Sequence, residues 1–156
     1  MSRSPRIAQA RVRLATNTLP QTPHRAGALC TGYRGYFRAA QARWYDRGFD
    51  ACLMEALACR DGLVLVKQQG IQHVWLETDC LELVNLWKKD DQRSIVDPVL
   101  KEIDDLRLAF QDFSFSYIIS RSYNKVAHVL AKQVSETWHV TLTCVYDLIM
   151  FEASAS

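Results

Sequence analysis

Two carboxylates stand at positions where they are suited to chemistry. Glu55 lies one turn into a predicted helix, on a stripe that continues through the small residues Ala58 and Gly62 and is therefore expected to face a sheet. A carboxylate on such a face is costly unless another group binds it. Asp79 ends the predicted strand HVWLETD, at the edge where open α/β sheets place their sites. Paired carboxylates of this kind suit Mg²⁺, which prefers oxygen ligands.

A purely structural interpretation of the same residues stays open. Asp79 would then cap the helix that follows it, and Glu55 would be a solvated residue on the outside of its helix. The two interpretations differ in whether the carboxylates hold a metal ion or only support local structure.

The elements that position these carboxylates follow from hydrophobic periodicity. In chain order they are strands over 27–31 and 36–44, a helix from 51 to about 69, a strand over 73–79, a helix over 81–89, a helix beginning near 97, a strand over 114–121 and a helix from 124 to about 137. This order indicates an α/β sheet that starts with an antiparallel hairpin.

Capping and breaking residues mark the ends of these elements. Asp50 is expected to cap the first helix and Gly70 to end it, while Asp97 is expected to cap the third helix, with Pro98 in its first turn. A cluster of prolines and polar residues predicts a loop over 15–25. Before it, residues 8–14 alternate between apolar and polar, as a half-exposed strand or an amphipathic arm does.

Composition excludes several classes of protein. With 156 residues, 49% hydrophobic and 23% charged, the chain fits one soluble globular domain. Its five cysteines include no CxxC pair, so neither a disulfide framework nor a zinc ribbon is indicated, and a reducing, intracellular location in the nucleus or cytoplasm is expected. No apolar run approaches the roughly 20 residues that span a bilayer, so no membrane partner is expected.

Charge is distributed unevenly along the chain. Residues 1–45 hold eight arginines and no acidic residue, although the whole chain carries a net charge of only +2. Such a stretch is either a basic arm that neutralises phosphates or a leader. The first twenty residues also have the composition of a transit peptide, which makes organelle import an alternative location.

Three segments resemble one family. MEALACRDGLVLVKQQGIQHVWLETDCLELVNLW, FSFSYIISRSYNKVAHVLAKQVS and GALCTGYRGYFRAAQARWYD are similar to the ribonuclease H type 1 superfamily, and specifically to the reverse-transcriptase-like ribonuclease H domains of plant retroelements and their domesticated relatives. The resemblance covers about residues 27–136. It implies an α/β fold with a mixed sheet, an antiparallel hairpin plus parallel strands, and helices on both faces. The domain is accordingly placed at 27–137, between a basic leader over 1–26 and an unmatched tail over 138–156.

The resemblance also implies a mechanism, in which two Mg²⁺ ions held by four acidic positions cut the RNA strand of an RNA–DNA hybrid; Mn²⁺ is a possible substitute. Glu55 and Asp79 match two of the metal-binding acids, and His128 occupies the fourth position, where it would ligate metal, guide water or help product leave. An ordinary capping or surface role for His128 stays open. The residues expected to contact RNA or an RNA–DNA hybrid are Arg34, Arg38, Asn124 and Lys125.

One departure puts the activity in question. The family's first acid is an Asp on the first strand, whereas this chain has no Asp or Glu before Asp46. Losing that ligand is expected to weaken metal binding and remove most activity, unless Asp46, Asp50 or Asp147 replaces it. We therefore expect a ribonuclease-H-like nucleic-acid-binding domain, with a non-catalytic interaction module or a decayed retroelement fragment as alternatives. A further hypothesis is that residues 1–26 are not the family's original start, and that the tail adds a strand or exposes an apolar patch.

Overall fold

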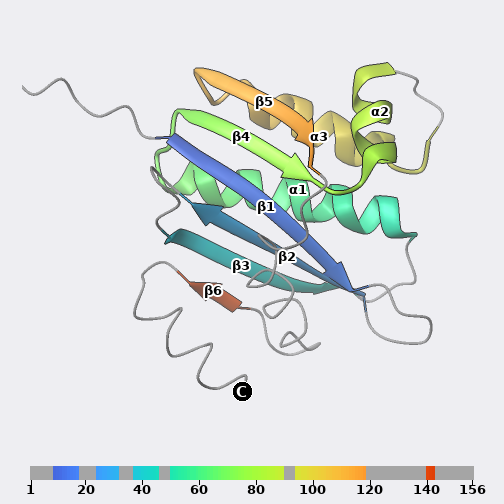
Figure 1. Ribbon diagram of the computed structural model, residues 1–156, viewed down its shortest axis with the longest axis horizontal. Coiled ribbons are helices and arrows are strands. Elements are labelled where there is room, and N and C mark those ends of the chain that lie inside the picture. The colour runs from blue at the N-terminus through green and yellow to red at the C-terminus, as the bar shows by residue number, and fades with distance from the viewer. Residues whose placement is uncertain are drawn as a thin grey trace, which may run out of the picture.

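The computed structural model describes residues 9–17, 24–31, 37–45, 50–89, 94–118 and 140–142. Within them lies a six-stranded sheet in the order β5-β4-β1-β2-β3-β6, accompanied by three helices (Figure 1). The elements are β1 (Gln9–Asn17), β2 (His24–Thr31), β3 (Phe37–Tyr45), α1 (Ala51–Gln68), β4 (His73–Thr78), α2 (Leu81–Lys89), α3 (Asp97–Arg107), β5 (Asp112–Tyr117) and β6 (Val140–Leu142). None of the helices described is long and apolar enough to cross a membrane.

The amino-terminal segment supplies a strand, β1, which lies in the centre of the sheet. It pairs in parallel with β4, from Gln9↔His73 to Arg13↔Glu77, and antiparallel with β2. The alternating sequence fits this place because Val12 is fully buried while the side chain of Arg11 stays 55% exposed. Arg11 lies 6.0 Å from the Trp75 ring centroid and 3.5 Å from Glu77, so the arginine is not buried without partners.

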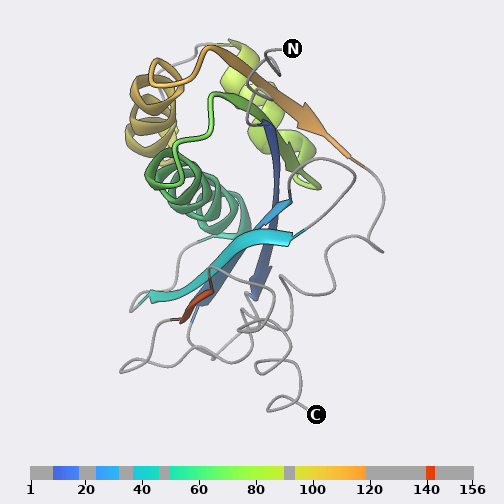
Figure 2. The ribbon, with the colours of Figure 1, turned by 90° about the vertical axis from the view of Figure 1, so that its left-hand side faces the viewer.

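The predicted α/β mixed sheet is confirmed. β2 and β3 form the antiparallel hairpin, and β4 and β5 run parallel to β1. Helices α1 and α3 lie on one face of the sheet (Figures 1 and 2). The helix predicted for residues 124–137 lies outside the described residues, so a helix on the second face stays a prediction.

Helix α1 begins and ends where its capping residues predict. The carboxylate of Asp50 accepts a hydrogen bond from the Leu53 backbone N–H at 2.7 Å. Gly70 follows the helix with a φ of 71°, a left-handed conformation that glycine adopts without strain. Thirteen residues of α1 are buried, because the helix packs on the sheet with one side and on α3 with another.

Two sequence-based boundaries are wrong. The loop predicted over 15–25 is shorter, because the β1–β2 ladder continues to Asn17↔Arg25 and its backbone hydrogen bonds outweigh the local turn signals. Asp97 does not cap α3: Val96 occupies that position, and the Asp97 carboxylate accepts a hydrogen bond from the Ser94 N–H at 2.7 Å, in the turn before the helix. The helix has a buried apolar face, on which Val99 and Ile103 lie.

The carboxyl-terminal tail contributes a short strand. Val140–Leu142 pairs antiparallel with β3, from Ala40↔Leu142 to Ala42↔Val140. Of the two alternatives for the tail, the extra strand is therefore correct for these three residues. The remainder of the tail lies outside the described residues.

The Leu76→Ala substitution tests the core between the sheet and the helices. Leu76 is fully buried in β4, between Val12 of β1 and Phe115 of β5. We expect the variant to lose about 2–5 kcal/mol of unfolding free energy in urea titrations, because the cavity adds to the lost transfer energy. The matched control is Leu108→Ala, since Leu108 is 76% exposed and should change stability by less than about 0.5 kcal/mol. Equal losses at the two positions would contradict this packing.

Candidate active site

Glu55 lies in the second turn of α1 and is buried, with 3% of its surface exposed. The hydroxyl of Thr78, the last residue of β4, donates a hydrogen bond to Glu55 Oε1 at 2.7 Å. The interpretation of Glu55 as a solvated helix residue is therefore wrong. The expectation that this carboxylate faces the sheet and is bound by another group is confirmed, and a hydroxyl is one of the groups that bind it.

Thr78 fixes the position of the residues around Asp79. Its side chain is fully buried, and its hydroxyl oxygen also accepts a hydrogen bond from the Cys80 N–H at 3.1 Å. Its backbone carbonyl accepts one from the Ile118 N–H at 2.9 Å. Asp79 lies between Thr78 and Cys80 and is exposed. The structure thus brings Glu55 and Asp79 to one place, because the residue that binds Glu55 directly precedes Asp79.

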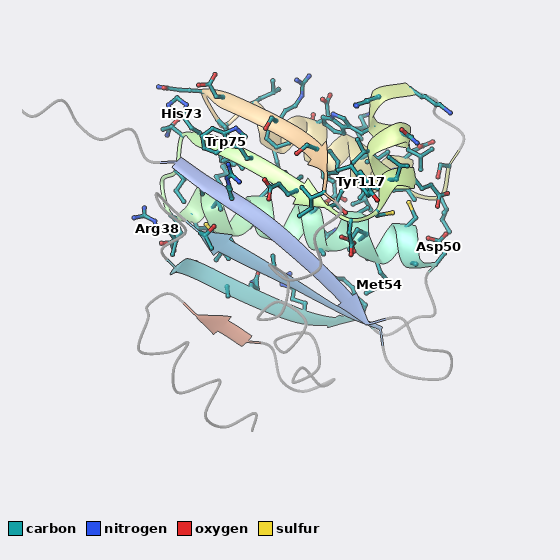
Figure 3. The ribbon with its side chains drawn as sticks, in the orientation of Figure 1. Arg38, Asp50, Met54, His73, Trp75 and Tyr117 are labelled. Atoms are coloured by element: carbon teal, nitrogen blue, oxygen red, sulfur yellow. The ribbon has the colours of Figure 1, made fainter. Side chains whose placement is uncertain are left out.

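This place is the end of the sheet where β4 stops and α1 starts (Figure 1). Asp50, which caps α1, and Met54, the residue before Glu55, are labelled at this end in Figure 3. The alternative in which Asp79 caps the following helix is not supported. Cys80, and not Asp79, directly precedes α2, and the Cys80 carbonyl accepts the first hydrogen bond of that helix, from the Val84 N–H at 3.4 Å. Asp79 is exposed to solvent, in a turn held by the hydrogen bonds of Thr78.

Thr78 was not singled out from the sequence, although a signal was available. In HVWLETD the alternation of buried residues passes through Val74 and Leu76 to Thr78, so a polar residue falls on the buried side of the strand. A buried hydroxyl needs a hydrogen-bond partner, and the nearest helix offers Glu55.

Cysteine side chains lie near Glu55 and Asp79. Burial raises the pKa of Cys59 well above its usual value, and the nearby Glu55 carboxylate raises it further. The pKa of Cys80 is lowered to about 7, chiefly through its interaction with Cys52 and also through the Leu83 backbone N–H, while partial burial opposes the shift. A thiol therefore adjoins the two carboxylates in the sequence and in the fold.

A two-metal centre needs a further carboxylate, and the strand beside β4 does not supply one. The register Arg13↔Glu77 places residues 14–17 of β1 level with and beyond Thr78, and none of them is acidic. Glu77 is no substitute, because it is buried and lies 3.5 Å from Arg11. In the described part of the chain no group of three or more His, Cys, Asp or Glu residues is suited to a metal ion. The residues present in this part do not fit a two-ion centre.

Asp50 does not rescue the site, because its carboxylate is engaged in capping α1. The other two candidates for rescue, Asp46 and Asp147, lie outside the described residues, as do His128, Asn124, Lys125 and Arg34. Arg38 is described: it is exposed on β3, at the opposite end of the sheet from Asp50 (Figure 3). The predicted nucleic-acid contact at Arg38 is therefore separate from the two carboxylates.

The Thr78→Val substitution tests the bond between β4 and α1. Valine has nearly the shape of threonine but cannot donate to Glu55 or accept from Cys80, so we expect a loss of about 1–3 kcal/mol of unfolding free energy. Thr78→Ser keeps the hydroxyl and should lose less. Chemical denaturation of the three proteins measures the difference. If the serine variant is the less stable of the two, the methyl packing and not the hydrogen bond is what Thr78 contributes.

Comparisons with known proteins agree with this architecture. A family model described as reverse transcriptase-like matches residues 16–134. The RNase H1 of the archaeon Halobacterium salinarum has a TM-score of 0.68 at 18% identity, over 80% of this chain and 96% of that one. The N-terminal RNase H domain of a Mycobacterium tuberculosis protein has a TM-score of 0.70 at 14% identity, over 96% and 99%.

A third structure, LC11-RNase H1 in complex with an RNA/DNA hybrid, has a TM-score of 0.70 at 13% identity, over 80% of this chain and 95% of that one. No curated protein matches the chain. At these identities the structures establish the RNase H fold alone. The family model spans most of the sequence, from the carboxyl end of β1 onward, and the chain therefore belongs to the reverse transcriptase-like family.

Proposed function

We propose that this chain is a nucleic-acid-binding domain that recognises RNA–DNA hybrids. We further propose that it has lost most of the activity by which two metal ions cleave the RNA strand. One observation carries both halves of the proposal: strands β1, β2 and β3 contain five arginines and no acidic residue. The arginines are Arg11, Arg13, Arg25, Arg38 and Arg43.

The arginines of these strands favour phosphate binding, although Arg11 is paired with Glu77 of the neighbouring strand β4. Sequence-independent affinity for nucleic acids comes mainly from cationic side chains that displace counterions from phosphates. Arg38 and Arg43 are both exposed on β3. The complex of LC11-RNase H1 with an RNA/DNA hybrid supports the choice of ligand, because that protein shares this fold.

The same absence of acids opposes catalysis. A two-metal mechanism relies on carboxylates that fix both ions, and β1 is the strand adjacent to the one that ends before Asp79. Within the described part of the chain, Glu55 and Asp79 offer Mg²⁺ or Mn²⁺ two carboxylates, and Glu55 is already bound by the Thr78 hydroxyl. Weak binding of a single ion is compatible with this set, whereas a two-ion clamp is not.

A labelled RNA–DNA hybrid tests both halves in one set of reactions. We expect the wild-type chain to bind the hybrid and to leave it uncut in Mg²⁺ or Mn²⁺. Cleavage that Asp79→Asn and Glu55→Gln both abolish would mean that another group replaces the missing acid, and the loss of hydrolysis would be refuted. Failure of a folded chain to bind any nucleic acid would instead favour a protein-interaction module.

Restoring an acid on β1 gives a positive test of why activity is lost. Even-numbered residues of β1 pair with the buried residues Val74 and Leu76 of β4. Continuing this register, position 14 lies opposite Thr78, and position 16 is the next even-numbered position along β1. We expect Thr16→Asp to produce hybrid cleavage in Mg²⁺ that the wild type lacks. Ala15→Asp is the matched control, because adjacent positions of a strand face opposite sides. Cleavage by both variants or by neither would refute this placement.

The contribution of Arg38 is measured by salt dependence. If Arg38 neutralises one phosphate, Arg38→Gln should weaken hybrid binding and reduce the slope of log K against log salt by about 1. Lys101→Gln removes the same charge from an exposed position of α3 and should leave the slope unchanged. Fluorescence anisotropy titrations at several salt concentrations give both slopes. Equal slopes for the two variants would show that net charge, and not this strand, sets the affinity.

A further inference from the structure

Strand β5 forms one edge of the sheet. Within the described part of the chain it pairs with β4 alone, and Figure 1 shows it as the outermost strand on that side. Its two serines and Tyr117 are exposed, and its two phenylalanines are half-buried. An edge strand presents a row of backbone groups that no neighbouring strand satisfies, and these groups can pair with another chain.

The backbone groups on the outer side of β5 belong to its odd-numbered residues. The N–H groups of Asp112 and Ile118, at its two ends, donate to carbonyls of the segment 72–78 at 3.2 and 2.9 Å. Successive N–H groups of a strand point to opposite edges, so the even-numbered residues of β5 bond to β4. The residues whose N–H and C=O groups point away from the sheet are Phe113, Phe115 and Tyr117.

The side chains of β5 alternate in the same phase. Phe113 and Phe115 pair with the buried residues Val74 and Leu76 of β4, so their rings lie on the side of the sheet that packs on the helices. Trp87 of α2 packs against both rings, with centroid separations of 6.1 and 5.7 Å. The sequence from 113 to 117 is Phe-Ser-Phe-Ser-Tyr, which has nearly the same chemistry in both directions.

The residues of β5 do not protect this edge from pairing. Natural edge strands often carry a lysine, a proline or a bulge that prevents association. Residues 113–117 contain no charged residue, proline or glycine, and the pairing of β5 with β4 continues without a shift of register. The one charged residue of the strand, Asp112, stands at its end.

We propose that this edge is a self-association site, at which β5 pairs antiparallel with β5 of a second copy about a two-fold axis at Phe115. In this register all three outward-facing residues of each copy form backbone hydrogen bonds with the other copy. Phe113 of each copy faces Tyr117 of the other, the two Phe115 residues face each other, and Ser114 faces Ser116. Cross-strand aromatic pairs stabilise such a pairing.

The symmetry of the strand favours a second copy over an unrelated peptide. A two-fold interface must be complementary to itself, and the order of aromatic residues and serines in β5 meets this requirement. Charge does not oppose the pairing, because Asp112 of each copy faces Ile118 of the other. One pair of strands is a small interface, so the dimer should dissociate on dilution.

The dimer leaves the arginine-bearing strand β3 free in both copies. In the order of the sheet, β3 lies four places from β5, and Arg38 is exposed on it. Each copy therefore keeps the surface to which we assign nucleic-acid binding. The association itself does not depend on whether the chain binds a hybrid.

Sedimentation velocity of the full-length chain at several concentrations, in a reducing buffer, tests for the dimer. We expect the wild type to change reversibly from monomer to dimer as the concentration rises. The double variant Ser114→Lys/Ser116→Lys places like charges opposite each other, so its dissociation constant should rise by about tenfold. The matched control is Ser114→Lys/Ser116→Glu, at the same two exposed positions, because each lysine would then face a glutamate and the dimer should persist. Circular dichroism verifies that all three proteins are folded.

Single cysteine variants test the register. Ser114 of one copy and Ser116 of the other form a pair without backbone hydrogen bonds, and a disulfide can bridge the Cα separation of about 4.5 Å in such a pair. Under a mild oxidant, an equimolar mixture of the Ser114→Cys and Ser116→Cys chains should form a disulfide-linked dimer with one chain of each kind. Either variant alone should form several-fold less, because identical positions lie diagonally across the axis. Peptide mass spectrometry distinguishes this link from disulfides of the native cysteines.

Several results would overturn the proposal. A folded wild-type chain that stays monomeric at every concentration would show that β5 does not associate. Equal dissociation constants for the two charge variants, or equal disulfide yields from the mixture and the single variants, would show that another surface or register is used. Open-ended oligomers would contradict a closed two-fold pairing. None of these results bears on hybrid binding, so the outcome is separable from the function proposed above.

Discussion

The parallel pairing of β1 with β4 is the constraint on which the rest of this structure depends. Through β1 the antiparallel strands β2 and β3 join the parallel strands β4 and β5 in one sheet, and α1 packs against both halves. The same pairing sets which residues of β1 lie beside the end of β4. Because the register is continuous from Gln9↔His73 to Arg13↔Glu77, the acid-free segment after Arg13 necessarily lies next to Asp79. The same pairing thus determines both the architecture and which residues lie beside Asp79.

Sequence reasoning succeeds where signals are local and agree with one another. The bounds of α2 are as predicted, and α1 differs by one residue at its end, because capping residues and a full apolar stripe coincide there. The predicted burial of Glu55 on the sheet side also holds, since helical periodicity alone determines which face it occupies.

Where sequence reasoning fails, long-range pairing decides the outcome. The extra strand residues at both ends of the predicted 15–25 loop exist because β1 and β2 satisfy each other's backbone groups, which no local pattern reports. Arg11 lies in a central strand because its side chain stays exposed beside Trp75 and Glu77, and no local pattern predicts these two partners. The role of Thr78 requires knowing which helix faces the end of β4, and only the tertiary structure gives that.

The presence of Glu55 does not by itself argue for catalysis. A buried carboxylate costs free energy unless hydrogen bonds stabilise it, and here a fully buried hydroxyl donates to it at 2.7 Å. Once such a pair exists, removing one partner leaves the other buried with fewer bonds, which is more costly than keeping both. Glu55 and Thr78 can therefore be retained for stability whether or not the chain hydrolyses a hybrid. Asp79 is different, because it is exposed and its removal should cost the fold little, so the function of this corner is better judged from Asp79 than from Glu55.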